Sequence, residues 1–180
     1  MTTGTQIALL RGINVGRAKR VAMADLRALV ESLGYGDVRT LLNSGNVVFT
    51  APAEVNAASR IEQSLPTRLG VSARVIVITA AELAAIVAAN SLLEISTDPS
   101  RLLVSVLANK ADRTRLEPLL KQDWAPDALA VGERAAYAWC AAGMASQLAE
   151  AIGRVLRDAA TTRNWATILK LHALASDCGR

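Results

Sequence analysis

The sequence predicts an α+β fold made of two successive βαββαβ units, the second degenerate and ending in a C-terminal helix. Three observations lead to this prediction. Short β-rich runs alternate with stretches of helical periodicity. Each half of the chain carries two β-rich runs separated by a short turn, which is typical of a hairpin. A turn-rich segment over residues 90–101 separates the two halves. Since βαββαβ is the ferredoxin-like pattern, we expect two ferredoxin-like units.

The first unit is expected within residues 1–78. Leu26, Leu29 and Val30 share one face of its first helix, and Gly34 follows as a stop signal. Pro66 is expected to distort the last turn of its second helix. The predicted elements are a strand over 7–10, a helix over 23–33, strands over 38–42 and 47–50, a helix over 54–70 and a strand over 71–78.

Residues 79–101 are expected to form a helix and a linker. Thr79 and Glu82 have the spacing of a capping box, in which each side chain accepts a hydrogen bond from the other residue's amide. Leu83, Ile86 and Val87 would share the apolar face of the helix that follows.

The second unit is expected within residues 102–180. Its elements are a strand over 102–107, a helix near 112–120, strands over 128–131 and 135–140, a helix over 144–156 and a final helix from just after Thr162 to about residue 175. A helix therefore stands where the pattern requires a fourth strand, and for this reason the unit is described as degenerate. We infer an internal duplication from this order of elements.

Composition sets broad limits. Hydrophobic residues make up 52% of the 180 residues, which is enough for a substantial core and too many for a disordered chain. The net charge of +4 permits contact with anions, nucleic acid or acidic lipid without requiring any of them. No signal peptide and no membrane-spanning stretch is visible, so a cytoplasmic protein without membrane partners is expected. Cys140 and Cys178 are then expected to be reduced thiols.

The first of three polar clusters follows the strand over 7–10. Its glycines allow positive φ or a close backbone approach, and its cations surround the start of the next helix. A phosphate could therefore sit against that helix N-terminus, although a tight turn with solvated basic residues explains the same pattern. The candidate binding residues here are Arg11, Gly12, Asn14, Gly16, Arg17 and Lys19, with Arg20 adding charge.

The second and third clusters supply further candidates. Ser44 and Asn46 could bind a ligand, or they could hydrogen-bond the backbone of their own hairpin turn. Thr162, Arg163 and Asn164 are expected at the start of the last helix, capped by Thr161 or Thr162. A cation in that first turn opposes the helix dipole, which indicates either a bound anion or a buried carboxylate partner.

No segment supplies a recognised catalytic set, so catalytic residues remain unknown. The first cluster lacks the Gly-Lys-Ser/Thr of a phosphate-binding P-loop and the Gly-x-Gly-x-x-Gly of a dinucleotide site. The lone histidine, His172, has no partner visible in the sequence, and a partly buried imidazole is the simpler reading. No cysteine or histidine spacing indicates a metal, and no cofactor is predicted.

Three segments together resemble the family known as domain of unknown function 1697: Leu9-Leu10-Arg11-Gly12-Ile13-Asn14-Val15-Gly16, Ser44-Gly45-Asn46-Val47-Val48-Phe49 and Thr161-Thr162-Arg163-Asn164-Trp165. They occur in the family's order over nearly the whole chain. The chain departs from the family pattern at Arg17, where a second glycine is common, and at Ala22, Asn43 and Ala166. The resemblance implies a two-part α+β fold of ferredoxin-like units and no established activity.

Three hypotheses of function follow. The first is a protein that binds a phosphate-bearing ligand, either a small molecule or a nucleic-acid backbone, through the first cluster. The second is a small-molecule enzyme with its site between the two units. The third is a non-catalytic structural or interaction module, with protein partners unknown. Recognition of RNA by base stacking is disfavoured because the two central strands offer only Phe49 as an aromatic residue.

Overall fold

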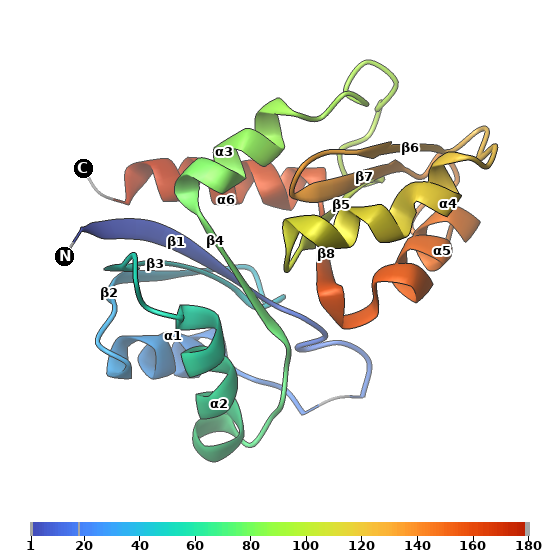
Figure 1. Ribbon diagram of the computed structural model, residues 1–180. Coiled ribbons are helices and arrows are strands. Elements are labelled where there is room, and N and C mark those ends of the chain that lie inside the picture. The colour runs from blue at the N-terminus through green and yellow to red at the C-terminus, as the bar shows by residue number, and fades with distance from the viewer. Residues whose placement is uncertain (1, 18, 179–180) are drawn as a thin grey trace. The chain divides into compact units, whose positions relative to one another are not determined.

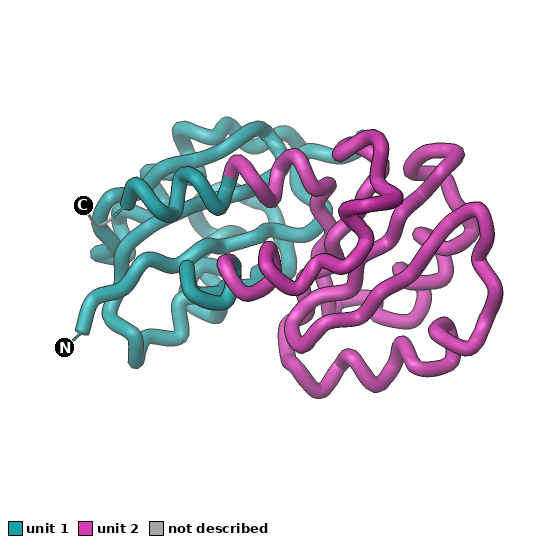
Figure 2. Tube along the Cα trace, turned by 90° about the horizontal axis from the view of Figure 1, so that it is seen from above, with its two compact units in different colours: residues 1–83, 171–180 teal, residues 84–170 magenta. Residues whose placement is uncertain are grey.

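A computed structural model of the protein describes residues 2–17 and 19–178. The chain forms two compact units, one of residues 1–83 with 171–180 and the other of residues 84–170 (Figure 2). We call these unit 1 and unit 2. Each unit contains one four-stranded antiparallel sheet (Figure 1), which confirms the α+β class and the two ferredoxin-like units. The division into 1–78, 79–101 and 102–180 stays a prediction.

The sheet of unit 1 has the strand order β2-β3-β1-β4. The register places Ala8 of the central strand opposite Val47 on one side and Val77 on the other. Ile7 and Leu9 point to one face of the sheet and Ala8 and Leu10 to the other, and none of the four is exposed to solvent. The strands are β1 (Thr3–Leu10), β2 (Gly36–Leu41), β3 (Asn46–Pro52) and β4 (Val75–Thr79).

Two helices, α1 (Met23–Ser32) and α2 (Ala57–Leu69), pack on one face of this sheet (Figure 1). Asn56 caps the start of α2, where its Oδ1 accepts a hydrogen bond from the Ser59 amide at 3.1 Å. The helix continues through Pro66 to Leu69, and Gly70, whose φ of 64° is left-handed, caps its C-terminal end. The core between helices and sheet includes Leu10, Leu26, Leu29, Val30, Phe49, Ile61 and Leu65.

The capping box that opens α3 (Ala80–Ala88) is confirmed. The Glu82 amide donates to Thr79 Oγ1 at 3.1 Å, and the Thr79 amide donates to Glu82 Oε2 at 2.9 Å. The boundary between the units falls inside this helix, after Leu83. Further along α3, the carbonyl of Ile86 accepts a hydrogen bond from the Tyr137 hydroxyl of unit 2 at 2.7 Å.

The sheet of unit 2 has the strand order β6-β7-β5-β8, which repeats the topology of unit 1. Its central strand β5 is fully buried, with Val104 opposite Tyr137 on one side and Arg163 on the other. The strands are β5 (Leu102–Leu107), β6 (Ala128–Val131), β7 (Ala135–Trp139) and β8 (Ala160–Asn164).

Strand β8 corrects the prediction that a helix replaces the fourth strand of unit 2. Thr162 and Arg163 are not in a first helical turn but pair with Ser105 and Val104 of β5. The two consecutive β-branched threonines favour an extended backbone, and pairing along β5 determines the outcome. The helix starts later, at Trp165, and Asn164 rather than a threonine caps it, because Asn164 Oδ1 accepts from the Thr167 amide at 2.9 Å.

Unit 2 differs from unit 1 mainly in its helices. The helix expected near 112–120 is a 3-10 segment, η1 (Lys110–Leu116), followed by the single turn α4 (Glu117–Leu120), where Pro118 removes one donor. A full helix, α5 (Gln147–Leu156), and the short η2 (Arg157–Ala159) precede β8. The core of the unit includes Leu103, Leu107, Leu116, Ala136, Leu148 and Ile152.

The last helix, α6 (Trp165–Asp177), is shared between the units, since unit 2 ends at residue 170 and unit 1 resumes at residue 171. Trp165 and Ile168 are buried near its start. At its other end, within unit 1, the carbonyl of Cys178 accepts a hydrogen bond from Thr5 Oγ1 at 2.9 Å. The C-terminal segment is therefore part of the first unit's structure.

Candidate functional site

The connection from β1 to α1 is irregular, and its described residues, 11–17 and 19–22, include three in the left-handed region. Gly12, Asn14 and Gly16 have φ values of 71°, 57° and 57°. Glycine adopts this conformation without strain, and asparagine tolerates it better than most residues. The glycines of the first cluster are thus needed for the path of the loop itself.

Asn14 holds this loop in place from within. Its Nδ2 donates to the carbonyls of Val21 and Asn43, both at 2.9 Å, and its Oδ1 accepts from the Val21 amide at 2.7 Å. Arg20 adds a further bond from its guanidinium to the Asn14 carbonyl at 2.7 Å. The side chain of Asn14, a predicted ligand contact, is therefore used in closing the loop and in joining it to the β2–β3 turn.

The first and second polar clusters meet in space. The Leu10 amide donates to the Gly45 carbonyl at 2.9 Å, and a Cβ placed on Gly45 would lie 2.5 Å from Ile13 Cγ2. Asn46 is fully buried, and its Nδ2 donates to the Leu41 carbonyl and to Ser44 Oγ. Ser44 and Asn46 thus stabilise the hairpin turn, which was the structural alternative for this cluster.

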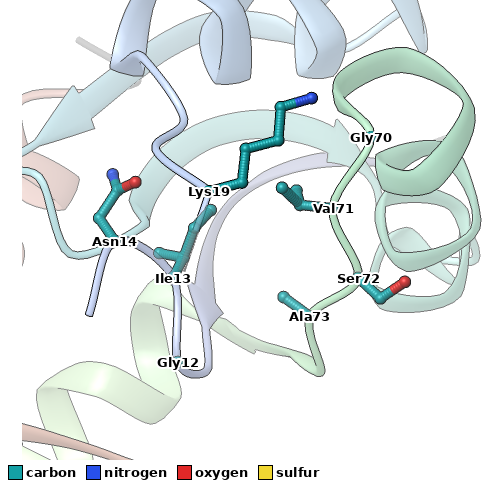
Figure 3. Close-up of a pocket in the computed structure, with 8 residues that line it drawn as sticks. All are labelled: Gly12, Ile13, Asn14, Lys19, Gly70, Val71, Ser72 and Ala73. Carbon is teal, nitrogen blue, oxygen red and sulfur yellow. The ribbon is translucent and has the colours of Figure 1, made fainter. Parts of the chain in front are cut away.

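A pocket of about 250 Å³ lies between the β1–α1 loop and the segment that links α2 to β4. Ile13, Val71 and Ala73 point into it, whereas the side chains of Asn14 and Ser72 point away (Figure 3). Five main-chain amides along the two walls donate to no hydrogen-bond acceptor among residues 2–17 and 19–178. They are the amides of Gly12, Ile13, Val71, Ser72 and Ala73. The pocket therefore combines apolar side chains with hydrogen-bond donors.

Lys19 extends from the loop toward Gly70 across one side of this pocket (Figure 3). Its Nζ donates to the carbonyl of Leu69, the last residue of α2, at 3.0 Å. A cation is favourable at this end of the helix because the terminal carbonyls carry partial negative charge. Lys19 is solvent-exposed apart from this contact.

A second hollow of about 320 Å³ shares Lys19 and Gly70 with this pocket. We call it the basic hollow, because three cations and one carboxylate line it: Lys19, Arg20, Arg68 and Asp25. Val21 also lines the hollow, which therefore reaches the start of α1. The N-cap residue there is Ala22, whose side chain makes no hydrogen bond to the first helical amides. Amides at an uncapped helix start add to the positive potential.

The third cluster lies in unit 2, on β8. Arg163 is 9% exposed, and its Nη1 donates to Thr161 Oγ1 and to the Thr162 carbonyl, both at 2.9 Å. Burial lowers the pKa of Arg163 to about 10. Thr162 is exposed, and its hydroxyl forms a hydrogen bond with Ser105 Oγ at 2.8 Å. Asn164 is occupied as the cap of α6.

The other predicted site residues of unit 1 lie around the loop. Arg11 directly follows β1, is half-buried, and its amide donates to the Arg74 carbonyl at 2.8 Å. Gly12 lines the 250 Å³ pocket, while Gly16 and Arg17 are exposed on the outer part of the loop. The structure thus gathers the first and second clusters at one end of the unit 1 sheet.

The sequence did not indicate Arg68, Asp25 or the segment over 70–73 as parts of a site. Arg68 lies in the last turn of α2 and Asp25 in the first turn of α1, positions where each charge is also favourable to its helix. In the sequence, Gly70 was a signal that the chain turns here, and the structure gives this glycine a left-handed φ.

The described residues also include two cysteine thiols and side chains of the types that can bind metal ions. Cys140 and Cys178 are buried free thiols, and burial raises the pKa of each. In the part of the chain that the structure describes, no group of three or more His, Cys, Asp and Glu side chains could hold a metal ion. No described helix combines the length and the apolar character that crossing a bilayer requires. The cytoplasmic location stays a prediction.

Fold and site together define a class: a two-unit α+β protein with ferredoxin-like topology in each half and a loop-built pocket beside a basic hollow in unit 1. Residues 3–137 match the family model described as "Protein of unknown function (DUF1697)", so the chain belongs to this family, as the motifs indicated. The Thr161–Trp165 motif lies outside the matched residues.

A solved structure shares the fold across the whole chain. It is described as "The structure of conserved bacterial protein SP0830 from Streptococcus pneumoniae", and it is similar to this chain with a TM-score of 0.76 and 20% sequence identity. The match covers 97% of this chain and 99% of the other. No curated protein matches the chain. These comparisons confirm the family and the fold.

Proposed function

We propose that unit 1 binds a small phosphate-bearing molecule, with its phosphate in the basic hollow. The single observation that carries the proposal is the grouping of Lys19, Arg20 and Arg68 around one concave space that also reaches the start of α1. Cations and helix amides together are the usual means by which proteins hold phosphate. Asp25 is the one carboxylate among the described residues of the lining, so the excess of positive charge remains.

A small molecule is favoured over a nucleic-acid backbone by the size of the site. The hollow and the neighbouring pocket measure about 320 and 250 Å³, which suits a compact ligand. A nucleic-acid backbone would instead be expected to use a row of exposed cations, and its affinity would fall steeply with salt. Phe49, the one aromatic residue on the two central strands, is fully buried and stacks on Tyr35, so it is not a platform for bases.

The test is a calorimetric titration of the protein with inorganic phosphate and with adenosine monophosphate, at two salt concentrations. Lys19→Met should weaken binding of both by about tenfold to a hundredfold, the usual effect of removing a charged hydrogen bond. The matched control is Lys121→Met, which removes an exposed lysine of unit 2 and should leave affinity unchanged.

Asp25→Asn gives a test of the opposite sign. Removing the one negative charge from the hollow should tighten phosphate binding by several-fold, because the Coulomb repulsion is lost. Equal affinities of wild type, Lys19→Met and Asp25→Asn would contradict the proposal.

A structural role for the same loop is the second candidate, and a specific observation favours it. Asn14 makes three side-chain hydrogen bonds inside the unit, and Lys19 bonds the end of α2. If the cluster is only structural, Lys19→Met lowers the melting temperature while neither wild type nor variant binds phosphate. Thermal unfolding measured beside the titrations separates the two functions.

A further inference from the structure

The two concave spaces that Lys19 lines differ in chemistry. The basic hollow carries three cations, whereas Lys19 is the one charged residue among the described residues that line the 250 Å³ pocket. Lys19 and Gly70 belong to the walls of both spaces, so the two are neighbours. A ligand that fills both must therefore have two chemically different ends.

The pocket favours an apolar group over a second anion. Ile13, Val71 and Ala73 point into it (Figure 3), and Val71 and Ala73 also pack against the buried core of unit 1. A second phosphate there would be desolvated against these methyl groups with a single shared cation. An apolar body would gain from the same contacts.

The pocket also imposes a hydrogen-bonding condition. The amides of Gly12, Ile13, Val71, Ser72 and Ala73 donate to no acceptor among the residues that the structure describes. Covering such amides with a purely apolar group would leave donors unsatisfied, which is costly. A ligand body that fits here must present acceptors, such as carbonyl oxygens or ring nitrogens, at its edge.

We propose that the ligand is a phosphate monoester whose body is a compact apolar group, such as a single aromatic ring, with hydrogen-bond acceptors at its edge. The phosphate occupies the basic hollow, the body occupies the 250 Å³ pocket, and Lys19 lies between them. This inference rests on the proposed function for the phosphate half. It adds the pocket half, for which Ile13, Val71 and Ala73 determine specificity.

The experiment compares three probes by calorimetric titration: inorganic phosphate, phenyl phosphate and 4-acetylphenyl phosphate. Burial of a ring should make phenyl phosphate bind about tenfold more tightly than inorganic phosphate. The added carbonyl acceptor should tighten binding by about another three- to tenfold. Inorganic phosphate binding as tightly as both esters would overturn the inference and leave the proposed function standing.

Ala73→Leu fills the pocket and should abolish the advantage of both esters while inorganic phosphate binds as before. Since Ala73 also contacts the core, Val71→Thr is the second variant, close in shape and more polar, with an expected loss of about three- to fivefold for the esters. The matched control is Ala58→Leu on α2, outside both spaces.

The outcomes separate the two proposals. No binding of any probe contradicts the proposed function. Binding of all three that is weakened by Lys19→Met but unchanged by Ala73→Leu and Val71→Thr supports the phosphate site and overturns the assignment of the pocket. Equal affinity for the two esters contradicts the requirement for acceptors.

Discussion

Unit 1 and unit 2 have the same strand order but differ in the structure that follows the central strands β1 and β5. In unit 1, β1 ends at Leu10 and α1 begins at Met23, so a long loop lies between them. In unit 2, β5 ends at Leu107 and η1 already begins at Lys110. A shared topology therefore leaves room for a loop-built site in one unit and hardly any in the other.

The backbone contacts at the two strand ends correspond closely. The Leu10 amide donates to the carbonyl of Gly45 at 2.9 Å, and the Leu107 amide donates to that of Arg134 at 3.0 Å. Arg11 likewise bonds the Arg74 carbonyl at 2.8 Å, and Ala108 bonds the Ala159 carbonyl at 2.7 Å. Gly45 and Arg134 thus hold equivalent positions in the two hairpin turns.

The residues at these equivalent positions explain the difference. Gly45 lets the loop approach closely, since a Cβ there would lie 2.5 Å from Ile13 Cγ2 and 2.8 Å from Leu10 Cβ. Arg134 instead turns back, and its guanidinium donates to the carbonyls of Leu107 and Ala108 at 2.8 and 3.2 Å. In unit 2 the Arg134 side chain therefore packs against the end of the central strand, where the β1–α1 loop packs in unit 1.

The largest effect is expected for Gly45→Ala. The new methyl group meets the root of Leu10 and the stiff branch of Ile13, and φ at this position is 78°. We expect a loss of about 2–4 kcal/mol in the free energy of unfolding, measured by urea denaturation. Gly132→Ala in the hairpin of unit 2 is the control, because its Cβ would lie 3.3 Å from Tyr137 Cε2 without a positive φ. Equal losses for the two variants would show that the turns are not built differently.

Asn14→Ala is expected to come next. It removes the side-chain bonds to Val21 and Asn43 and puts alanine at a φ of 57°, so about 2–3 kcal/mol of stability should be lost. Asn14→Gly keeps the backbone unstrained and should recover about 1 kcal/mol of that loss. Identical stability of both variants would mean that the positive φ carries no cost.

Arg134→Met should cost about 1–2 kcal/mol. The substitution keeps the apolar stem but leaves the carbonyls of Leu107 and Ala108 without the guanidinium. The matched control is Arg113→Met, which removes another arginine of unit 2, exposed on η1. If the free energy of unfolding of Arg134→Met equalled that of Arg113→Met, the hydrogen bonds from Arg134 to the end of β5 would not contribute to stability.

The smallest effect is a pH dependence within unit 2. Burial raises the pKa of Tyr137 to about 12 from an ordinary value near 10. Because the pKa is higher in the folded state, the neutral Tyr137 side chain contributes fully to the free energy of unfolding below pH 10, and this contribution is lost as the pH rises toward 12. At pH 10.5 wild type should lose about 1 kcal/mol of stability relative to Tyr137→Phe.

The comparison for Tyr137 is made as the change in unfolding free energy between pH 8 and 10.5 in each protein. Burial also shifts the pKa of Arg163 and of the two thiols, but these groups are present in both proteins and cancel in the difference. Parallel pH profiles would contradict an effect of Tyr137 ionisation.

Most of the fold could be predicted because its signals are local. The apolar run 102–107 and the turn around Gly45 depend on neighbouring residues, and β5 has the predicted bounds. The Thr79–Glu82 capping box is equally local. Strand β8 could not be predicted, because its extended form depends on pairing with β5, which lies more than fifty residues earlier in the chain.

The candidate site was predicted only in part, for a similar reason. The loop cations and glycines were visible as a cluster, but Arg68 reaches the basic hollow from α2, and Ala73 reaches the neighbouring pocket from the segment beyond α2. Asn14 and Asn46 had the residue types of a ligand site, and the structure uses both side chains inside the unit. Sequence shows which polar groups are present, whereas hydrogen-bond partners depend on the fold.

The shared helix α6 has a consequence for the order in which the two units can complete their folding during translation. A ribosome releases the chain from the N-terminus, and domains generally fold as units once their residues have emerged. Unit 2 is complete in sequence at residue 170, whereas unit 1 still lacks the segment whose Cys178 carbonyl accepts from Thr5 and whose thiol contacts the Asp37 carbonyl. The unit that begins first during translation is therefore the one that finishes last.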